Sequence, residues 1–93
     1  MHAVLVTVDI AAGRGDETEK LLHEGTIPRA KSLAGFQRGV WMRSSDKSTG
    51  RGVMLFDTEE NATAAVTAVE QGQPPDAPVK IRSVETFEVM AEA

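Results

Sequence analysis

The alternation of apolar and polar residues divides the chain into short strands and two amphipathic helices. Residues 2–10 (HAVLVTVDI) are rich in valine and apolar at almost every position, which is typical of a strand with both faces covered. Residues 36–44 and 51–57 are two further apolar runs, and the polar loop between them predicts a hairpin. A last strand is expected at 80–90, where the apolar positions change parity near 83–85 and indicate a β-bulge.

The first helix is expected over residues 16–33. Asp16 stands at its start, with Glu19 three residues later in the position of a capping box. Pro28 falls inside the helical pattern. Because proline has no N–H group to donate, we expect it to kink or interrupt this helix.

The second helix is expected over residues 58–71. Its start signal is either Asp57 paired with Glu60 or Thr58 as the capping residue itself. Apolar residues then recur with helical spacing and predict a buried stripe of Ala62, Ala65, Val66 and Val69. Gln71–Gly72 ends this helix.

The order of the elements is β-α-β-β-α-β. This order predicts an α+β, ferredoxin-like sandwich, in which an antiparallel sheet carries both helices on one face. Residues 1–93 are too few for more than one domain of ordinary size.

The faces of the strands suggest how the protein assembles. In the second strand Phe36, Val40 and Met42 share a parity that suits the helix side, which would place Trp41 and Arg43 on the opposite face. The first and third strands are apolar on both faces. Since large exposed apolar surfaces mark interaction sites, we expect two copies to pack sheet against sheet as a homodimer.

Composition excludes several classes of protein. The chain has no cysteine, so no disulfide or thiolate–metal site can stabilise it, and its net charge of −4 argues against nucleic acid as a partner. It shows no signal peptide and no run of about 20 apolar residues, so we expect no membrane partner and a cytoplasmic location. Basic residues nevertheless gather between Arg29 and Arg51.

The sequence resembles the dimeric α/β-barrel superfamily, and within it the antibiotic biosynthesis monooxygenase-like group. The similarity extends over nearly the whole chain and is carried by residues 27–31 (IPRAK), 35–36 (GF) and 55–60 (LFDTEE). It implies a homodimer with a small-molecule pocket in each subunit. Some members oxidise phenols or quinols without metal or flavin, and others degrade haem.

We expect a cavity between sheet and helices, touched by Trp41 and with Arg43 at its mouth, that takes a planar aromatic ligand. Trp41 could stack on such a ligand, and Arg43 could bind a carboxylate or an enolate. Met54 and Phe56 complete the expected ligand-binding set. The alternatives are that Trp41 fills the dimer interface and that Arg43 pairs with Glu85 or Glu88.

His23 is the candidate general base, because imidazole titrates near neutral pH. Glu19, one turn earlier, could orient it. His2 is expected at a strand edge without a role. The two histidines do not have the spacing of metal ligands, so we expect no metal and no cofactor.

The resemblance assigns haem degradation to an asparagine–tryptophan–histidine set, from which this chain departs. It has Thr7 on the first strand and no histidine on the second helix, and it lacks the tyrosine that supplies a phenolic acid in this fold. Two hypotheses remain: a cofactor-independent monooxygenase-like enzyme, and a non-catalytic ligand-binding or structural dimer.

Overall fold

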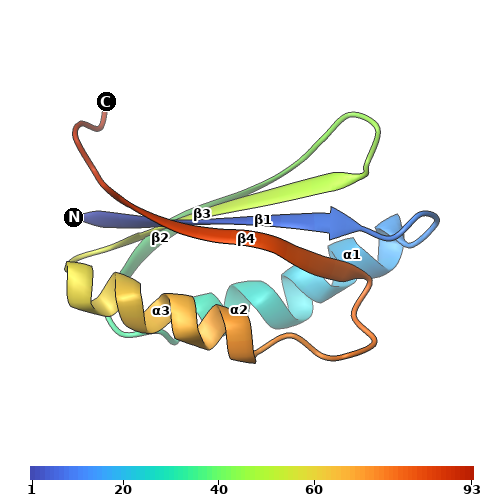
Figure 1. Ribbon diagram of the computed structural model, residues 1–93, viewed down its shortest axis with the longest axis horizontal. Helices are drawn as coiled ribbons and strands as arrows, with labels where there is room; N and C mark the ends of the chain where they lie inside the picture. The colour runs from blue at the N-terminus through green and yellow to red at the C-terminus, as the bar shows by residue number, and fades with distance from the viewer.

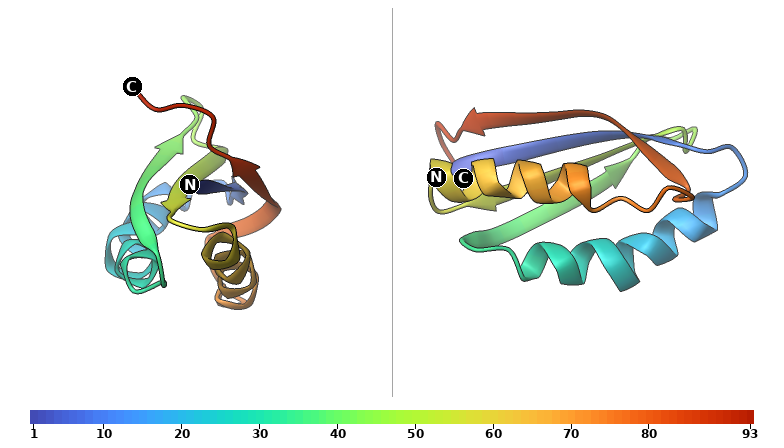
Figure 2. Two further views of the ribbon diagram at one scale, coloured as in Figure 1. Left: turned by 90° about the vertical axis from the view of Figure 1, so that its left-hand side faces the viewer. Right: turned by 60° about the horizontal axis from the view of Figure 1, so that its bottom comes forward.

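Four antiparallel strands form one sheet with the order β2-β3-β1-β4, and all the helices cover the same face of it (Figure 1). The structure is a computed structural model that describes residues 1–93. Seen end-on, the sheet forms one layer and two helical rods lie side by side beneath it (Figure 2). The elements are β1 (His2–Ile10), α1 (Gly15–Leu21), the π-helix η1 (Leu22–Thr26), α2 (Ile27–Lys31), β2 (Phe36–Arg43), β3 (Thr49–Phe56), α3 (Glu59–Gln71) and β4 (Val79–Glu88). This confirms the ferredoxin-like arrangement.

The first helical rod changes its winding before Pro28. It begins as α1, widens into the π-helix η1 at Leu22–Thr26, and continues as α2 with Pro28 in its first turn. Because Pro28 cannot donate to the carbonyl four residues earlier, a regular α-helix is unfavourable there, and the wider turn removes the need for that bond. The expected interruption is therefore present, as a change of winding.

The expected capping box at Asp16 is wrong. The helix begins at Gly15, and its capping residue is Arg14, whose side chain accepts no capping hydrogen bond. The side chain of Arg14 instead donates to the Glu17 carboxylate at 2.7 Å. The acidic residues of the first turn thus act through charge rather than as caps.

The start of α3 decides between the two capping alternatives. Thr58 is the capping residue, and its hydroxyl oxygen accepts a hydrogen bond from the Asn61 N–H at 3.1 Å. Asp57 accepts from the Asn61 side-chain amide at 2.8 Å, which fixes the preceding turn. Ala62 and Ala65 are buried against the sheet, as the helical spacing predicted.

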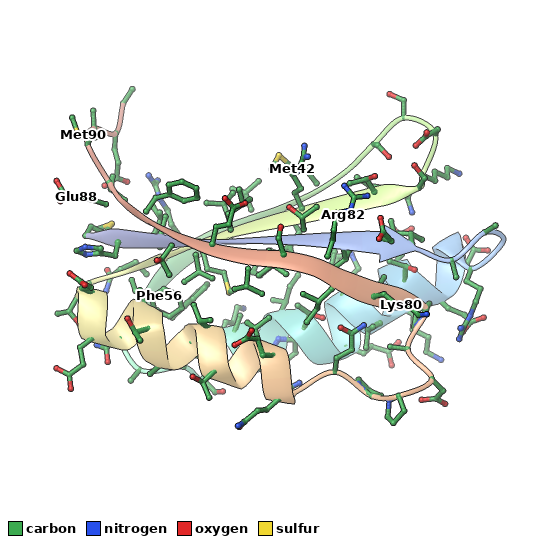
Figure 3. The ribbon with its side chains drawn as sticks, in the orientation of Figure 1. Met42, Phe56, Lys80, Arg82, Glu88 and Met90 are labelled. Carbon is green, nitrogen blue, oxygen red and sulfur yellow. The ribbon has the colours of Figure 1, made fainter.

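The predicted faces of β2 are wrong beyond Phe36. The pairing of β2 with β3 shifts between Phe36 and Arg38, so that one extra residue enters the strand and the parity reverses. Trp41 therefore faces the helices together with its partner Gly52. Val40 and Met42 lie on the open face of the sheet, 58% and 49% exposed. Figure 3 shows Met42 pointing away from the helices.

The expected bulge in β4 is also present, slightly earlier than predicted. The pairing with β1 jumps from Thr7–Ser83 to Val8–Ile81, which leaves Arg82 as the extra residue. Arg82 turns to the open face and forms an ion pair with Asp9.

The packed core fills only one half of the space between the sheet and the helices. It centres on Phe56 and Val4, which are fully buried, and on the alanines of α3. Phe56 points from the sheet toward α3 (Figure 3). Val6 and Trp41 pack at the margin of this core. No helix in the structure has the length and apolar character needed to cross a membrane.

Candidate functional site

The other half of the space between sheet and helices is a cavity of about 550 Å³. This volume lies in the range of pockets that hold small organic ligands. The sheet forms its floor through the ends of β1, β2, β3 and β4, and the rod α1–η1–α2 forms its opposite wall. The end of α3 and the connector that follows it close the side. The apolar residues of the wall and floor include Val8, Ile10, Leu22, Leu33, Val69 and Ile81.

Several positions on the face of the sheet toward the helices lack side chains. Gly50 and Gly52 alternate along β3 on the face toward the helices, and Gly39 stands on the neighbouring strand. Glycine is uncommon in strand interiors and marks places where another group approaches the backbone closely. At Gly39 and Gly52 that group is the Trp41 indole, and at Gly50 it is the side chain of Val8.

Trp41 lies across the positions of two missing side chains. A Cβ atom at Gly39 would stand 2.6 Å from the Cη2 atom of the indole, and a Cβ atom at Gly52 would stand 2.7 Å from its Nε1 atom. Both ends of the ring system are therefore close to the sheet. Trp41 is part of the cavity floor, as expected, although the predicted strand parity had placed it on the other face.

Arg43 also faces the cavity, and no carboxylate neutralises it. It pairs with Gly50 across the strands, and its Nη1 atom lies 3.8 Å from where a Cβ atom of Gly15 would be. None of the ion pairs in the structure includes Arg43. The alternative partners Glu85 and Glu88 are on β4, at the far edge of the sheet, so that alternative is wrong.

The border of the cavity is positively charged. Arg29 and Arg43 lie along it, and Glu19 is the one carboxylate among the lining residues. Arg29 also donates a hydrogen bond to the carbonyl oxygen of Gly72 at 2.7 Å, which joins α2 to the end of α3. A net-negative protein thus presents a cationic border at this cavity.

His23 lies on the π-helix η1 and contributes to the cavity wall. Its side chain is exposed, and no hydrogen bond joins it to Glu19. The wider winding of η1 affects which side chains face the cavity. Three consecutive residues, Leu21, Leu22 and His23, all line it. Single π-turns are frequent at functional sites.

The remaining candidates divide between cavity and core. Met54 lies on the boundary, since it belongs to the buried core and also touches the cavity. Phe56 does not line the cavity and packs edge-to-face on Phe36, with ring centroids 6.0 Å apart. His2 is outside the cavity, where its Nε2 atom lies 3.5 Å from Glu59.

Sequence reasoning missed the three floor glycines as parts of the site. The glycines carried a usable signal, because two of them alternate within an apolar strand and the third precedes the single tryptophan by two residues. Arg29 was part of the basic run noted in the sequence, and the tertiary structure brings its guanidinium to the Gly72 carbonyl.

Solved structures with the same architecture come from several organisms. The heme-degrader MhuD of Mycobacterium tuberculosis, solved with two hemes in its active site, matches with a TM-score of 0.76 at 18% identity, over 100% of this chain and 99% of its own. SnoaB of Streptomyces nogalater, a cofactor-independent oxygenase, matches with a TM-score of 0.69 at 15% identity, over 98% and 95%. A dimeric ferredoxin-like protein from an uncultured marine organism matches with a TM-score of 0.67 at 14% identity, over 100% and 98%.

Other matching structures are candidate antibiotic biosynthesis monooxygenases from Chloroflexus aurantiacus and Bordetella bronchiseptica. The chain has the fold of the antibiotic biosynthesis monooxygenase-like group. No family model and no curated protein sequence matches it.

The cavity contains Trp41 but lacks the asparagine and the second-helix histidine of the set that the resemblance assigns to haem degradation. Thr7 is buried and does not line the cavity. The helix α3 contributes Ala68 and Val69 to the wall, and it contains no histidine. The one imidazole at the cavity is His23, which comes from the other helical rod.

Proposed function

We propose that this protein binds a small planar aromatic compound in the cavity above Trp41 and oxidises it as a cofactor-independent monooxygenase-like enzyme. The observation that carries the proposal is the combination of an indole floor with the uncompensated guanidinium of Arg43. An apolar pocket with a few convergent polar groups is the usual form of a small-molecule site. The likeness to SnoaB in fold supports oxygenase chemistry.

The proposed chemistry is oxidation of a phenol or quinol by molecular oxygen. His23 takes the phenolic proton, and Arg43 stabilises the resulting anion. The anion reacts with O₂: one oxygen atom enters the ring, the other leaves as water, and the substrate itself supplies the electrons. Trp41 holds the ring in place, and the apolar wall limits the access of water to the intermediate.

The second candidate is a binding protein without catalysis. It is favoured by the exposure of His23 and by its lack of a carboxylate partner to orient the imidazole. The two candidates share the ligand and differ only in the proton transfer. The experiment must therefore measure binding and turnover separately.

The test uses anthrone and 1,4-dihydroxynaphthalene as probes. Binding is followed by quenching of Trp41 fluorescence, which is unambiguous because the chain has one tryptophan. Turnover is followed as oxygen consumption above the rate in buffer. We expect both signals, and we expect His23→Gln to lower turnover by about 10²-fold while binding is retained. Quenching without oxygen consumption would support the binding protein, and absence of both signals would exclude both candidates.

We also propose that the protein is a homodimer that pairs through the open face of its sheet. Val40, Met42 and Phe87 are about half exposed on that face, and Val53 and Leu55 lie between them. An apolar surface of this kind on a small domain indicates an interaction site. The dimeric ferredoxin-like protein of the same fold supports this assembly.

Sedimentation at micromolar concentration tests the dimer. A chain of 10.0 kDa should sediment at twice that mass. Val40→Lys should shift the equilibrium toward the monomer, because it places a charge in the apolar contact. Glu24→Lys, on the exposed surface of η1, is the matched control and should leave the mass unchanged. A stable monomer of the unmodified chain would contradict the proposal.

A further inference from the structure

The Trp41 indole runs along the surface of the sheet rather than standing up from it. Its six-membered ring lies above Gly39 and its Nε1 edge lies above Gly52, each within 2.7 Å of where a Cβ atom would be. An upright indole would bring only one of its ends this close. The long axis of the ring system is therefore parallel to the sheet.

The two glycines are required for this orientation. Real Cβ atoms do not approach other atoms this closely, so a methyl group at either position must push the indole away. The two positions are on neighbouring strands, and Gly52 is the direct pairing partner of Trp41. Glycine weakens a strand interior, so its use at both positions needs a reason, and the flat indole supplies one.

The resulting floor suits flat ring systems. The upper side of the indole faces the cavity, whose opposite wall is formed by aliphatic residues of the helical rod, among them Leu22 and Leu33. Aromatic rings prefer offset stacking on such a surface. A flat ligand can use the full area of the indole, whereas a globular ligand touches only part of it.

The arginines at the border of the cavity favour a ligand with a negative charge. Two arginines, Arg29 and Arg43, stand against one carboxylate there, and Arg43 is free of any ion pair. Guanidinium groups bind carboxylates and phenolates through charge-assisted hydrogen bonds. An acidic group at the edge of the ring system would reach this border while the rings lie on Trp41.

We propose that Gly39 and Gly52 are specificity-determining positions that hold the Trp41 indole flat, so that the cavity selects a planar, fused-ring anion lying parallel to the sheet. This inference rests on the proposed function of the same cavity and names the shape and charge of its ligand. Gly39 and Gly52 are positioning residues, because they act through Trp41.

The binding test compares three probes by quenching of Trp41 fluorescence. Anthraquinone-2-carboxylate is flat and anionic, 2-methylanthraquinone is flat and neutral, and adamantane-1-carboxylate is anionic and globular. We expect anthraquinone-2-carboxylate to bind at least tenfold more tightly than either of the others. Equal affinity for the flat and the globular carboxylate would overturn the shape preference, and equal affinity for the charged and neutral anthraquinones would overturn the charge preference.

The variants Gly39→Ala and Gly52→Ala test the role of the glycines. Each should weaken anthraquinone-2-carboxylate at least tenfold and should leave adamantane-1-carboxylate within about threefold. The matched control is Gly13→Ala, which lies outside the cavity and whose new methyl group meets no atom within 4 Å. It should bind all probes like the unmodified chain. Unchanged binding in both floor variants would overturn the inference.

A measurement without ligand separates this inference from the proposed function. Both floor variants should increase quenching of Trp41 by acrylamide about twofold, because the displaced indole becomes more accessible. If the unmodified chain binds no probe, the ligand class fails together with the proposed function. If it binds the probes and acrylamide quenching does not change, only the role of the glycines fails.

A double-mutant cycle covers the case in which a floor variant is poorly folded. Gly52→Ala is compared in the unmodified chain and in a Trp41→Ala background, with thermal unfolding followed by circular dichroism. If the methyl group acts through the indole, its effect on Tm should fall at least by half in that background. An equal effect in both backgrounds would overturn the inference.

Discussion

The guanidinium of Arg29 donates a hydrogen bond to the carbonyl oxygen of Gly72 at 2.7 Å. Gly72 is the residue at the end of α3, where the last carbonyl groups of a helix lack partners within it. Arg29 thus caps α3 with a positive charge at the negative end of its dipole. The same bond holds the two helical rods together beside the cavity.

Removing this bond should loosen the helical layer. Arg29→Met keeps a long apolar stem and removes the donors, so we expect the free energy of unfolding to fall by about 1 kcal/mol. Urea denaturation measures this change. Arg29→Lys is the control for charge and should restore only part of the loss, because an ammonium group does not reproduce the geometry of a guanidinium. An unchanged midpoint for Arg29→Met would show that the bond has no net effect.

Phe56 should be the most costly single truncation in the chain. It is fully buried and packs on Phe36 and on the alanines of α3, so Phe56→Ala leaves a cavity that the core cannot close. We expect a loss of about 3–5 kcal/mol, measured by chemical denaturation. Phe56→Leu keeps most of the volume and should cost less than about 1.5 kcal/mol. A loss for Phe56→Ala no larger than that of Phe56→Leu would contradict this packing.

Gly35 should not accept a side chain. Its φ angle is +76°, and a methyl group there would overlap the Asp57 carboxylate and the Asn61 amide. The control is Gly13→Ala, where φ is +79° and no atom lies within 4 Å of the new methyl group. Gly13→Ala should cost about 1 kcal/mol from the backbone alone, and Gly35→Ala should cost clearly more. Equal losses in urea denaturation would mean that the contact with Asp57 is adaptable.

The hairpin between β2 and β3 should add stability that depends on pH. Asp46 accepts hydrogen bonds from the Ser44 hydroxyl and from the Ser48 hydroxyl and N–H, which lower its pKa from 3.8 to about 2. A folded-state pKa below the unfolded value stabilises the protein above the unfolded pKa, and this contribution is lost as pH falls from about 4 to about 2.

The measurement is Tm as a function of pH for the unmodified chain and for Asp46→Ala. The difference in Tm should be constant above pH 5 and should shrink toward pH 2. A chain with both Ser44→Ala and Ser48→Ala keeps the carboxylate without its hydroxyl donors, and its Tm should depend less steeply on pH in this window. A Tm difference that stays constant down to pH 2 would contradict the role of Asp46.

Local signals in the sequence were enough for the elements and their order. The valine run of β1, the Thr58 cap and the alanine stripe of α3 each act within a few residues, so they can be recognised without knowledge of the fold. The effect of Pro28 was also local, since the missing N–H disturbs only its own turn. The short polar loop between β2 and β3 then predicts their antiparallel pairing.

The positions of the site residues depend on contacts between strands, and local sequence patterns do not predict those contacts. Strand parity placed Trp41 on the open face, and a single extra residue in the pairing of β2 with β3 turned it toward the helices. The period of side chains along a strand is two, so one inserted residue exchanges the faces of everything beyond it. The sequence by itself therefore determined which elements form, while only the paired sheet decided that Trp41 and Arg43 share a cavity with His23 and Arg29.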